Sequence, residues 1–95
     1  MSRAKQVEIS LVGVSSSSQL HKILAESLGF PAFYGCNWDA FWDTITDLVE
    51  MPLLIKFIGW SEFEALLPNE ANMLRQCLEE QNEINPNIAP KILFT

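Results

Sequence analysis

The segment Phe33-Tyr34-Gly35-Cys36-Asn37-Trp38-Asp39-Ala40-Phe41-Trp42-Asp43 carries the clearest structural signal in this chain. From its tryptophans onward, large apolar side chains recur at the spacing of three and four residues that places them on one side of a helix. The pattern predicts a helix with Asn37 near its N-cap and with Pro52 limiting its C-terminal end. Its apolar stripe consists of Trp38, Phe41, Trp42, Ile45, Leu48 and Val49.

A second stripe of the same helix is polar. Asp39, Asp43, Thr46 and Glu50 follow the helical spacing beside the apolar stripe, and no lysine or arginine lies between Asn37 and Glu50. Aspartates four residues apart repel one another, at a cost of about 0.2–0.5 kcal/mol. Tryptophans that border a row of carboxylates are well suited to a protein interface. This side of the helix therefore suits a partner that carries several positive charges.

Length and composition indicate one globular domain over residues 1–95. Apolar residues make up 48% of the chain and aromatic residues 11%, which is typical of an ordinary core. No apolar run approaches the roughly 18 residues that a membrane-spanning helix needs. The first eight residues lack the apolar stretch of a secretory signal, so we expect a cytoplasmic protein.

The net charge of −6 is unevenly distributed. Residues 37–83 contain ten acidic and two basic side chains, whereas residues 1–36 have a net charge of +1. This polarity argues against direct nucleic-acid binding, which needs basic residues to neutralise phosphates. It is compatible with a protein that competes with nucleic acid for a basic site. A generic acidic surface would give the same composition.

The residues with the greatest chemical reactivity do not form a catalytic or metal-binding motif. Cys36 and Cys77 are expected to be free thiols in a reducing compartment, with Cys36 in an exposed loop and Cys77 on a buried helical stripe. The lone His21 is expected to have a packing or surface role, so we predict no zinc site and no cofactor. The serines at positions 15–18 are interpreted as a loop and a helix cap.

The remaining patterns predict an α/β protein. Strands separated by helices imply a parallel sheet, because a parallel return needs a long crossover. The predicted strands cover 7–12, 53–58 (expected to be covered on both faces) and 91–95. The predicted helices are one capped by Ser17 or Ser18 and ended by Gly29, the one that starts near Asn37, a short one at 61–67, and one capped by Asn69 that runs to about 82 and buries Met73, Leu74, Cys77, Leu78 and Gln81. The order of the strands does not follow from these patterns.

The run Tyr34-Gly35-x-Asn37-x-Asp39-Ala40-x-Trp42-Asp43, followed by Thr46 and Pro52-Leu53, resembles the loop and second helix of the barstar family. Barstar is a small intracellular inhibitor of a secreted bacterial ribonuclease. The similarity begins upstream at Leu20-His21 and covers nearly the whole chain. It implies a barstar-like fold, in which a three-stranded parallel sheet packs against about three to four helices.

The resemblance also implies a binding site. In barstar-like proteins the loop and second helix plug the ribonuclease active site, and an aspartate that corresponds to Asp43 replaces a substrate phosphate. Asp39 matches another interface aspartate, and Glu80 aligns with a glutamate on a later helix. Cys36 stands where the family has an acid, and Leu48 replaces an aromatic, so the implied target is a similar nuclease but not necessarily the same one. The other implied contact positions are Phe33, Asn37, Trp38, Trp42, Thr46 and Leu48.

Three hypotheses about function follow. The leading one is a non-enzymatic inhibitor or immunity protein, monomeric when free, that binds a basic extracellular-type or toxin ribonuclease in a 1:1 complex. A second is a small hydrolase that uses Asp39 and Asp43 as a carboxylate pair, although such a pair would need a pocket. A third is a regulatory module, or a toxin-immunity protein, that binds some other basic protein.

Overall fold

Three parallel strands form the sheet within residues 3–95, which are the residues described by a computed structural model. They are β1 (Val7–Ser10), β2 (Leu54–Ile58) and β3 (Lys91–Phe94), in the spatial order β1-β2-β3. Their register places Val7 beside Ile55, and Ile55 beside Ile92. The predicted parallel sheet is confirmed. The strand order, which the sequence left open, makes the most apolar strand the central one.

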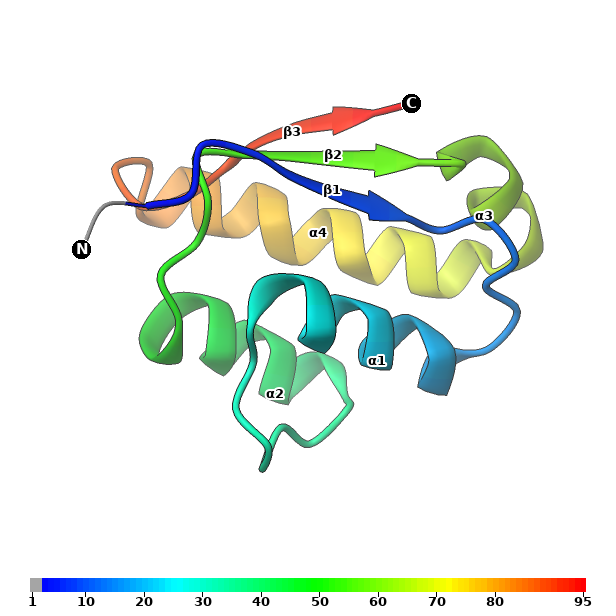
Figure 1. The fold of residues 1–95 in the computed structure, drawn as a ribbon, viewed down its shortest axis with the longest axis horizontal. Coiled ribbons are helices and arrows are strands. Elements are labelled where there is room, and N and C mark those ends of the chain that lie inside the picture. The colour runs from blue at the N-terminus through cyan, green and yellow to red at the C-terminus, as the bar shows by residue number, and fades with distance from the viewer. Residues whose placement is uncertain (1–2) are drawn as a thin grey trace.

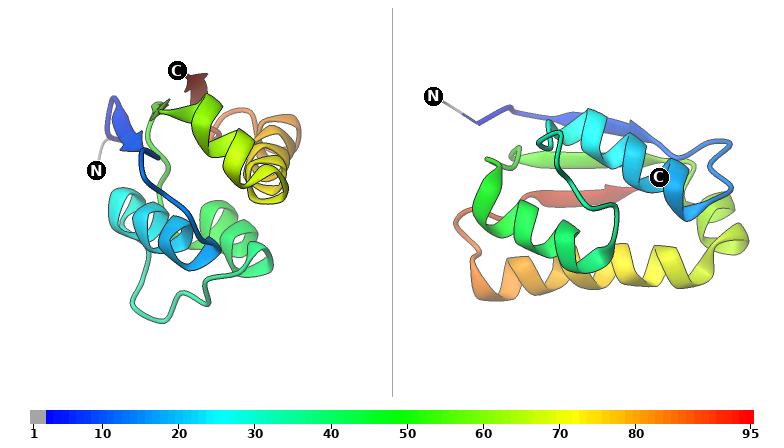
Figure 2. Two further views of the ribbon diagram at one scale, coloured as in Figure 1. Left: turned by 90° about the vertical axis from the view of Figure 1, so that its right-hand side faces the viewer. Right: turned by 90° about the horizontal axis from the view of Figure 1, so that it is seen from below.

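The helices cover one face of this sheet. α1 (Ser17–Leu28) and α4 (Pro68–Ile84) lie nearest to the strands, α2 (Trp38–Asp43) lies beside these two helices and farther from the sheet, and α3 (Trp60–Leu66) follows the end of β2 (Figures 1 and 2). The expectation that β2 is covered on both faces is therefore wrong. Ile55 and Phe57 are fully buried, but the alternate side chains Leu54, Lys56 and Ile58 are only partly buried. The nearly continuous run of apolar residues at 53–58 did not distinguish the buried face of the strand from its more exposed face.

The core lies between the sheet and the helix layer. Phe41 and Ile45, at the centre of the predicted apolar stripe, are fully buried, as are Ile9 and Phe57 on the sheet. A helix that buries one stripe leaves the neighbouring stripe exposed. The core thus fixes which side of the second helix faces solvent, and that side carries Asp39.

The sequence predicted that the second helix is one continuous α-helix. The structure shows that this prediction is wrong. After Asp43 the helix continues as a π-helical turn, η1 (Thr44–Leu48), in which the backbone N–H of Val49 donates to the carbonyl of Thr44 at 3.1 Å. Wider turns of this kind displace the usual backbone hydrogen bonds. The amide Nε2 of Gln81 on α4 donates to the carbonyl of Ile45 at 2.8 Å and satisfies one buried acceptor. This bond ties η1 to α4.

Helix ends show where local sequence signals succeeded and failed. Asn37 caps α2, and Gly29 ends α1 in the left-handed conformation, at φ 70°, as predicted. The cap of α1 is Ser16, however, rather than Ser17 or Ser18. Asn69 does not cap α4, because Pro68 already occupies the first helical position, where its missing N–H costs nothing.

Other differences are small. β1 ends at Ser10 instead of Val12, α3 starts one residue early, and β3 ends at Phe94. Met73, which was expected to be buried on α4, is 36% exposed, whereas Leu74, Cys77, Leu78 and Gln81 are buried as predicted. None of the helices within residues 3–95 has both the length and the apolar character that crossing a bilayer requires.

Candidate functional site

An open groove of about 450 Å³ runs between α2 and α4. These two helices lie next to one another in both views of Figure 2. Five predicted site residues meet at this groove: Asp39, Asp43 and the two tryptophans come from α2, and Glu80 comes from α4. The full lining is Trp38, Asp39, Trp42, Asp43, Met73, Cys77 and Glu80.

The walls of the groove combine charge with flat apolar surface. Asp39, Asp43 and Glu80 are exposed, and Trp38 and Trp42 are partly buried at the edge of the core. Because the aspartates lie one helical turn apart, both face the same side of α2. The carboxylate of Glu80 approaches from the neighbouring helix. A cation placed in this groove would therefore meet negative charge from two directions.

The groove carboxylates are not neutralised by the rest of the described chain. Within residues 3–95 the ion pair that forms joins Arg75 to Glu64, neither of which lines the groove. Cys77 lies in this groove. Burial raises the pKa of its thiol to about 11, and the charges of Glu80 and Asp39 act in the same direction. A thiolate is disfavoured there because it would add a further negative charge.

The loop before α2 is held against the helix by local contacts. Asn37 Oδ1 accepts from the backbone N–H of Ala40 at 2.7 Å, and its Nδ2 donates to the carbonyl of Gly35 at 3.2 Å. A Cβ atom at Gly35 would lie 3.3 Å from the Asn37 amide, so this close approach favours glycine. Cys36 adopts the left-handed conformation, at φ 53°, which is uncommon for a residue with a side chain.

Four predicted site residues do not line the groove. Phe33 is 77% exposed in the loop, Asn37 acts as the cap of α2, and Leu48 is 53% exposed at the end of η1. The hydroxyl of Thr46 donates to the carbonyl of Trp42 at 2.7 Å, so its proton is already used inside the helix. Phe33 and Leu48 are exposed to solvent outside the lining of the groove. The role of all nine predicted residues in binding stays a prediction.

Sequence reasoning missed three residues near the site. Cys77 and Met73 were assigned to the core of α4, but both line the groove. Glu70 was not singled out at all, although its Oε2 accepts from the indole N–H of Trp38 at 3.0 Å. Met73 and Cys77 are four residues apart on α4, and this helical spacing could have indicated that they lie on the same side of the helix. Nothing in the sequence connects Glu70 with a tryptophan 32 positions away.

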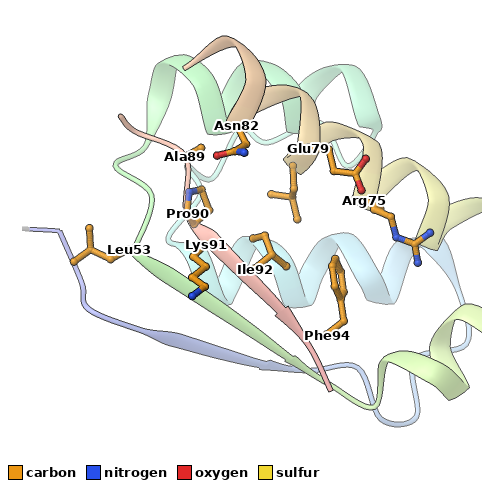
Figure 3. A pocket seen from close by; sticks show the side chains of 10 residues that line it. Leu53, Arg75, Glu79, Asn82, Ala89, Pro90, Lys91, Ile92 and Phe94 are labelled. Atoms are coloured by element: carbon orange, nitrogen blue, oxygen red, sulfur yellow. The ribbon is translucent and has the colours of Figure 1, made fainter. Parts of the chain in front are cut away.

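A second hollow, of about 430 Å³, lies on the other side of α4, between this helix and the edge strand β3 (Figure 3). Leu78, Ile92 and Phe94 give it an apolar lining. Arg75 at one end is paired with Glu64 and lies over the ring of Phe94, 5.7 Å from its centre. None of the predicted site residues lies here, so the two hollows have separate linings.

The carboxylates of the groove can also be compared with the arrangements of metal ligands and catalytic pairs. Within the described part of the chain no cluster of three histidine, cysteine, aspartate or glutamate residues has the arrangement of a metal site. Asp39 and Asp43 are exposed on a helix surface, whereas catalytic carboxylate pairs depend on unequal, partly buried environments to separate their pKa values. Both carboxylates are accessible from solvent on the same side of α2.

The fold is that of a small α/β protein, and acidic and aromatic side chains line the groove between α2 and α4. A comparison with protein families matches residues 4–93 to the family described as "Barstar (barnase inhibitor)". The chain belongs to the barstar family. A Bacillus subtilis (strain 168) protein named "Putative ribonuclease inhibitor YrdF" is 33% identical over 64 residues, which cover 67% of this chain and 70% of the relative. The family inferred from the sequence and its α/β fold are therefore confirmed.

Proposed function

We propose that this protein is a cytoplasmic inhibitor of a basic ribonuclease, which it binds as a monomer in a 1:1 complex. The observation that carries the proposal is the α2–α4 groove, where Asp39, Asp43 and Glu80 lie beside two tryptophans without a cationic partner in the described chain. Ribonucleases hold RNA phosphates with basic side chains. A rigid acidic surface can occupy that site in place of RNA. Membership of the barstar family supports this assignment.

The mechanism would be occlusion of the active site. Asp43 would take the place of a substrate phosphate, and Asp39 and Glu80 would meet further cations around it. Trp38, Trp42, Phe33 and the other predicted contacts would supply apolar area and exclude water from these charge pairs. Because the groove exists in the free protein, little ordering is needed on association. Complementary charge would also accelerate the encounter.

The first test is titration of barnase, the enzyme for which the family is named as inhibitor, with this protein while RNA hydrolysis is followed. We expect activity to fall linearly to zero at one equivalent. An unchanged rate of hydrolysis, together with failure of the immobilised chain to retain a ribonuclease from its native host, would contradict the proposal. Retention of a different basic protein would favour the regulatory-module hypothesis. Turnover of a substrate would favour the hydrolase hypothesis.

The second test identifies the binding surface. Asp43→Ala should weaken the complex by at least about 2 kcal/mol, the threshold of an interface hot spot, a category for which the barnase–barstar pair is itself a standard example. Removal of Asp43 would leave clustered cations of the enzyme buried without a partner. Glu80→Ala should cost less, and Glu62→Ala on α3 removes the same charge away from the groove as a control. If Asp43→Ala inhibits as well as the parent protein, the groove is not the binding surface.

A further inference from the structure

Glu70 connects three helices through one carboxylate oxygen. It lies in the first turn of α4, where the helix dipole favours a negative charge. Its Oε2 accepts from the indole N–H of Trp38 at 3.0 Å and from the hydroxyl of Ser17 at 3.3 Å. Ser17 and Trp38 are the first residues of α1 and α2. All three helices start at the same end of the layer (Figure 2), and Glu70 joins them there.

Two aromatic rings also pack against Trp38. The ring of His21 lies 4.6 Å from its centre, and the ring of Phe41 lies 5.3 Å away in an edge-to-face arrangement. His21 is itself held by a hydrogen bond between Nδ1 and the hydroxyl of Tyr34, at 2.5 Å. The indole N–H is the one polar group of a tryptophan side chain. Its bond to Glu70 therefore selects a single orientation among those that the two rings allow.

We infer that Glu70 is a positioning residue for partner binding, a role that rests on the proposed function. Glu70 is absent from the lining of the groove, but Trp38 is part of it, next to Asp39. Glu70 acts through Trp38: it fixes the indole as a preformed wall of the groove. A partner then meets a surface that needs no further ordering, which lowers the cost of association and slows dissociation.

The binding test compares substitutions that separate hydrogen bonding from charge. Glu70→Leu removes the acceptor, and we expect barnase to dissociate roughly tenfold faster while the association rate changes little. Glu70→Gln removes the charge but keeps an oxygen that can accept from the indole, so it should dissociate within about threefold of the parent rate. Ser17→Ala removes the other bond to the same oxygen without affecting Trp38 and should bind like the parent protein. Equal losses in Glu70→Leu and Glu70→Gln would show that charge, not positioning, is responsible.

A second readout follows Trp38 directly in the free protein. Its indole N–H resonance in NMR spectra is assigned by its absence in Trp38→Phe. We expect this proton to exchange slowly with solvent in the parent and in Glu70→Gln, and rapidly in Glu70→Leu. Slow exchange in folded Glu70→Leu would overturn the inference, whatever the protein binds. Failure of the parent protein to bind barnase would instead count against the proposed function, so the two failures are distinguishable.

Discussion

His21 illustrates how the fold gives a single residue a measurable property. It is 1% exposed, and its Nε2 has no hydrogen-bond partner within the described chain. Burial lowers the pKa of His21 from its ordinary value of 6.5, and the negative charge of Glu70 opposes this shift only in part. The sequence predicted a packing or surface role for this histidine. The packing role is correct, because the ring is buried and packs against Trp38 at a tilt of 55°.

The lowered pKa predicts how stability depends on pH. The unfolded chain takes up a proton on His21 near pH 6.5, whereas the folded protein does so only at lower pH. Between these pKa values the unfolded state binds more protons, so the free energy of unfolding falls as the pH falls below about 6.5. Urea unfolding between about pH 7.5 and 5.5 should show this slope in the parent and a smaller one in His21→Gln. Identical slopes would show that His21 is not the titrating group.

The two thiols should differ in reactivity. Cys36 is exposed in the loop, whereas Cys77 is 7% exposed and its pKa is raised to about 11. Thiolates react, and Cys77 forms very little thiolate at neutral pH. With a disulfide reagent such as dithionitrobenzoate, we expect one group to react rapidly in the native protein and two in the denatured protein. Absence of any reactive thiol after denaturation would contradict the prediction that both are reduced.

At the scale of the element, η1 explains why periodicity alone described the second helix incompletely. Phe41 and Ile45 were correctly assigned to the core, because a stripe of that spacing faces inward in any helical continuation. The π-turn was not predicted, because the spacing of apolar residues does not record which backbone carbonyls accept side-chain hydrogen bonds. Thr44 and Thr46 donate to carbonyls one turn earlier, at 2.7 Å, and thereby compete with the regular backbone ladder. The side-chain amide of Gln81, from α4, donates a hydrogen bond to the backbone carbonyl of Ile45.

Removal of the Gln81 amide should destabilise this element. Gln81→Met keeps a similar unbranched shape but leaves the buried carbonyl of Ile45 without its donor, at a cost of about 1–3 kcal/mol. Gln76→Met, at an exposed position of the same helix, is the matched control and should have little effect. The free energy of unfolding in urea measures both. Equal stabilities for the two variants would mean that water replaces the lost donor at η1.

At the scale of the whole molecule, the sequence predicted which helices and strands the fold contains better than it predicted how they are arranged in space. The alternation of strands and helices was sufficient to predict a parallel sheet. The excess of acidic residues within 37–83 was sufficient to predict an acidic surface. Strand order and the open face of β2 depend on packing between distant segments, which no local pattern records. For the site, helical spacing placed Asp39 and Asp43 together. Glu80 was identified as a site residue only through the family resemblance, and the contact of Glu70 with Trp38 was identified only in the structure.

The concentration of negative charge predicts how salt affects binding. Raising the salt concentration from about 0.1 M to about 1 M shortens the screening length from roughly 10 Å to roughly 3 Å. We expect association with barnase to slow markedly, because long-range attraction is screened, and dissociation to change much less. Stopped-flow kinetics measure both rates. A dissociation rate that rises more than the association rate falls would argue against steering by the acidic groove.

The one-sided arrangement of helices has a practical consequence for engineering. The groove lies between α2 and α4, whereas Lys56 and its register neighbour Leu93 alternate with the buried face of the strands and so lie on the opposite face of the sheet. The exposed residues of the helices can therefore be varied on one side of the sheet, and the other side remains available for attachment to a solid support. Libraries that vary exposed positions of α2 and α4 could be selected against other basic targets. The same molecules could be tethered to a sensor through the opposite side, so the protein is suited to serve as a compact binding scaffold.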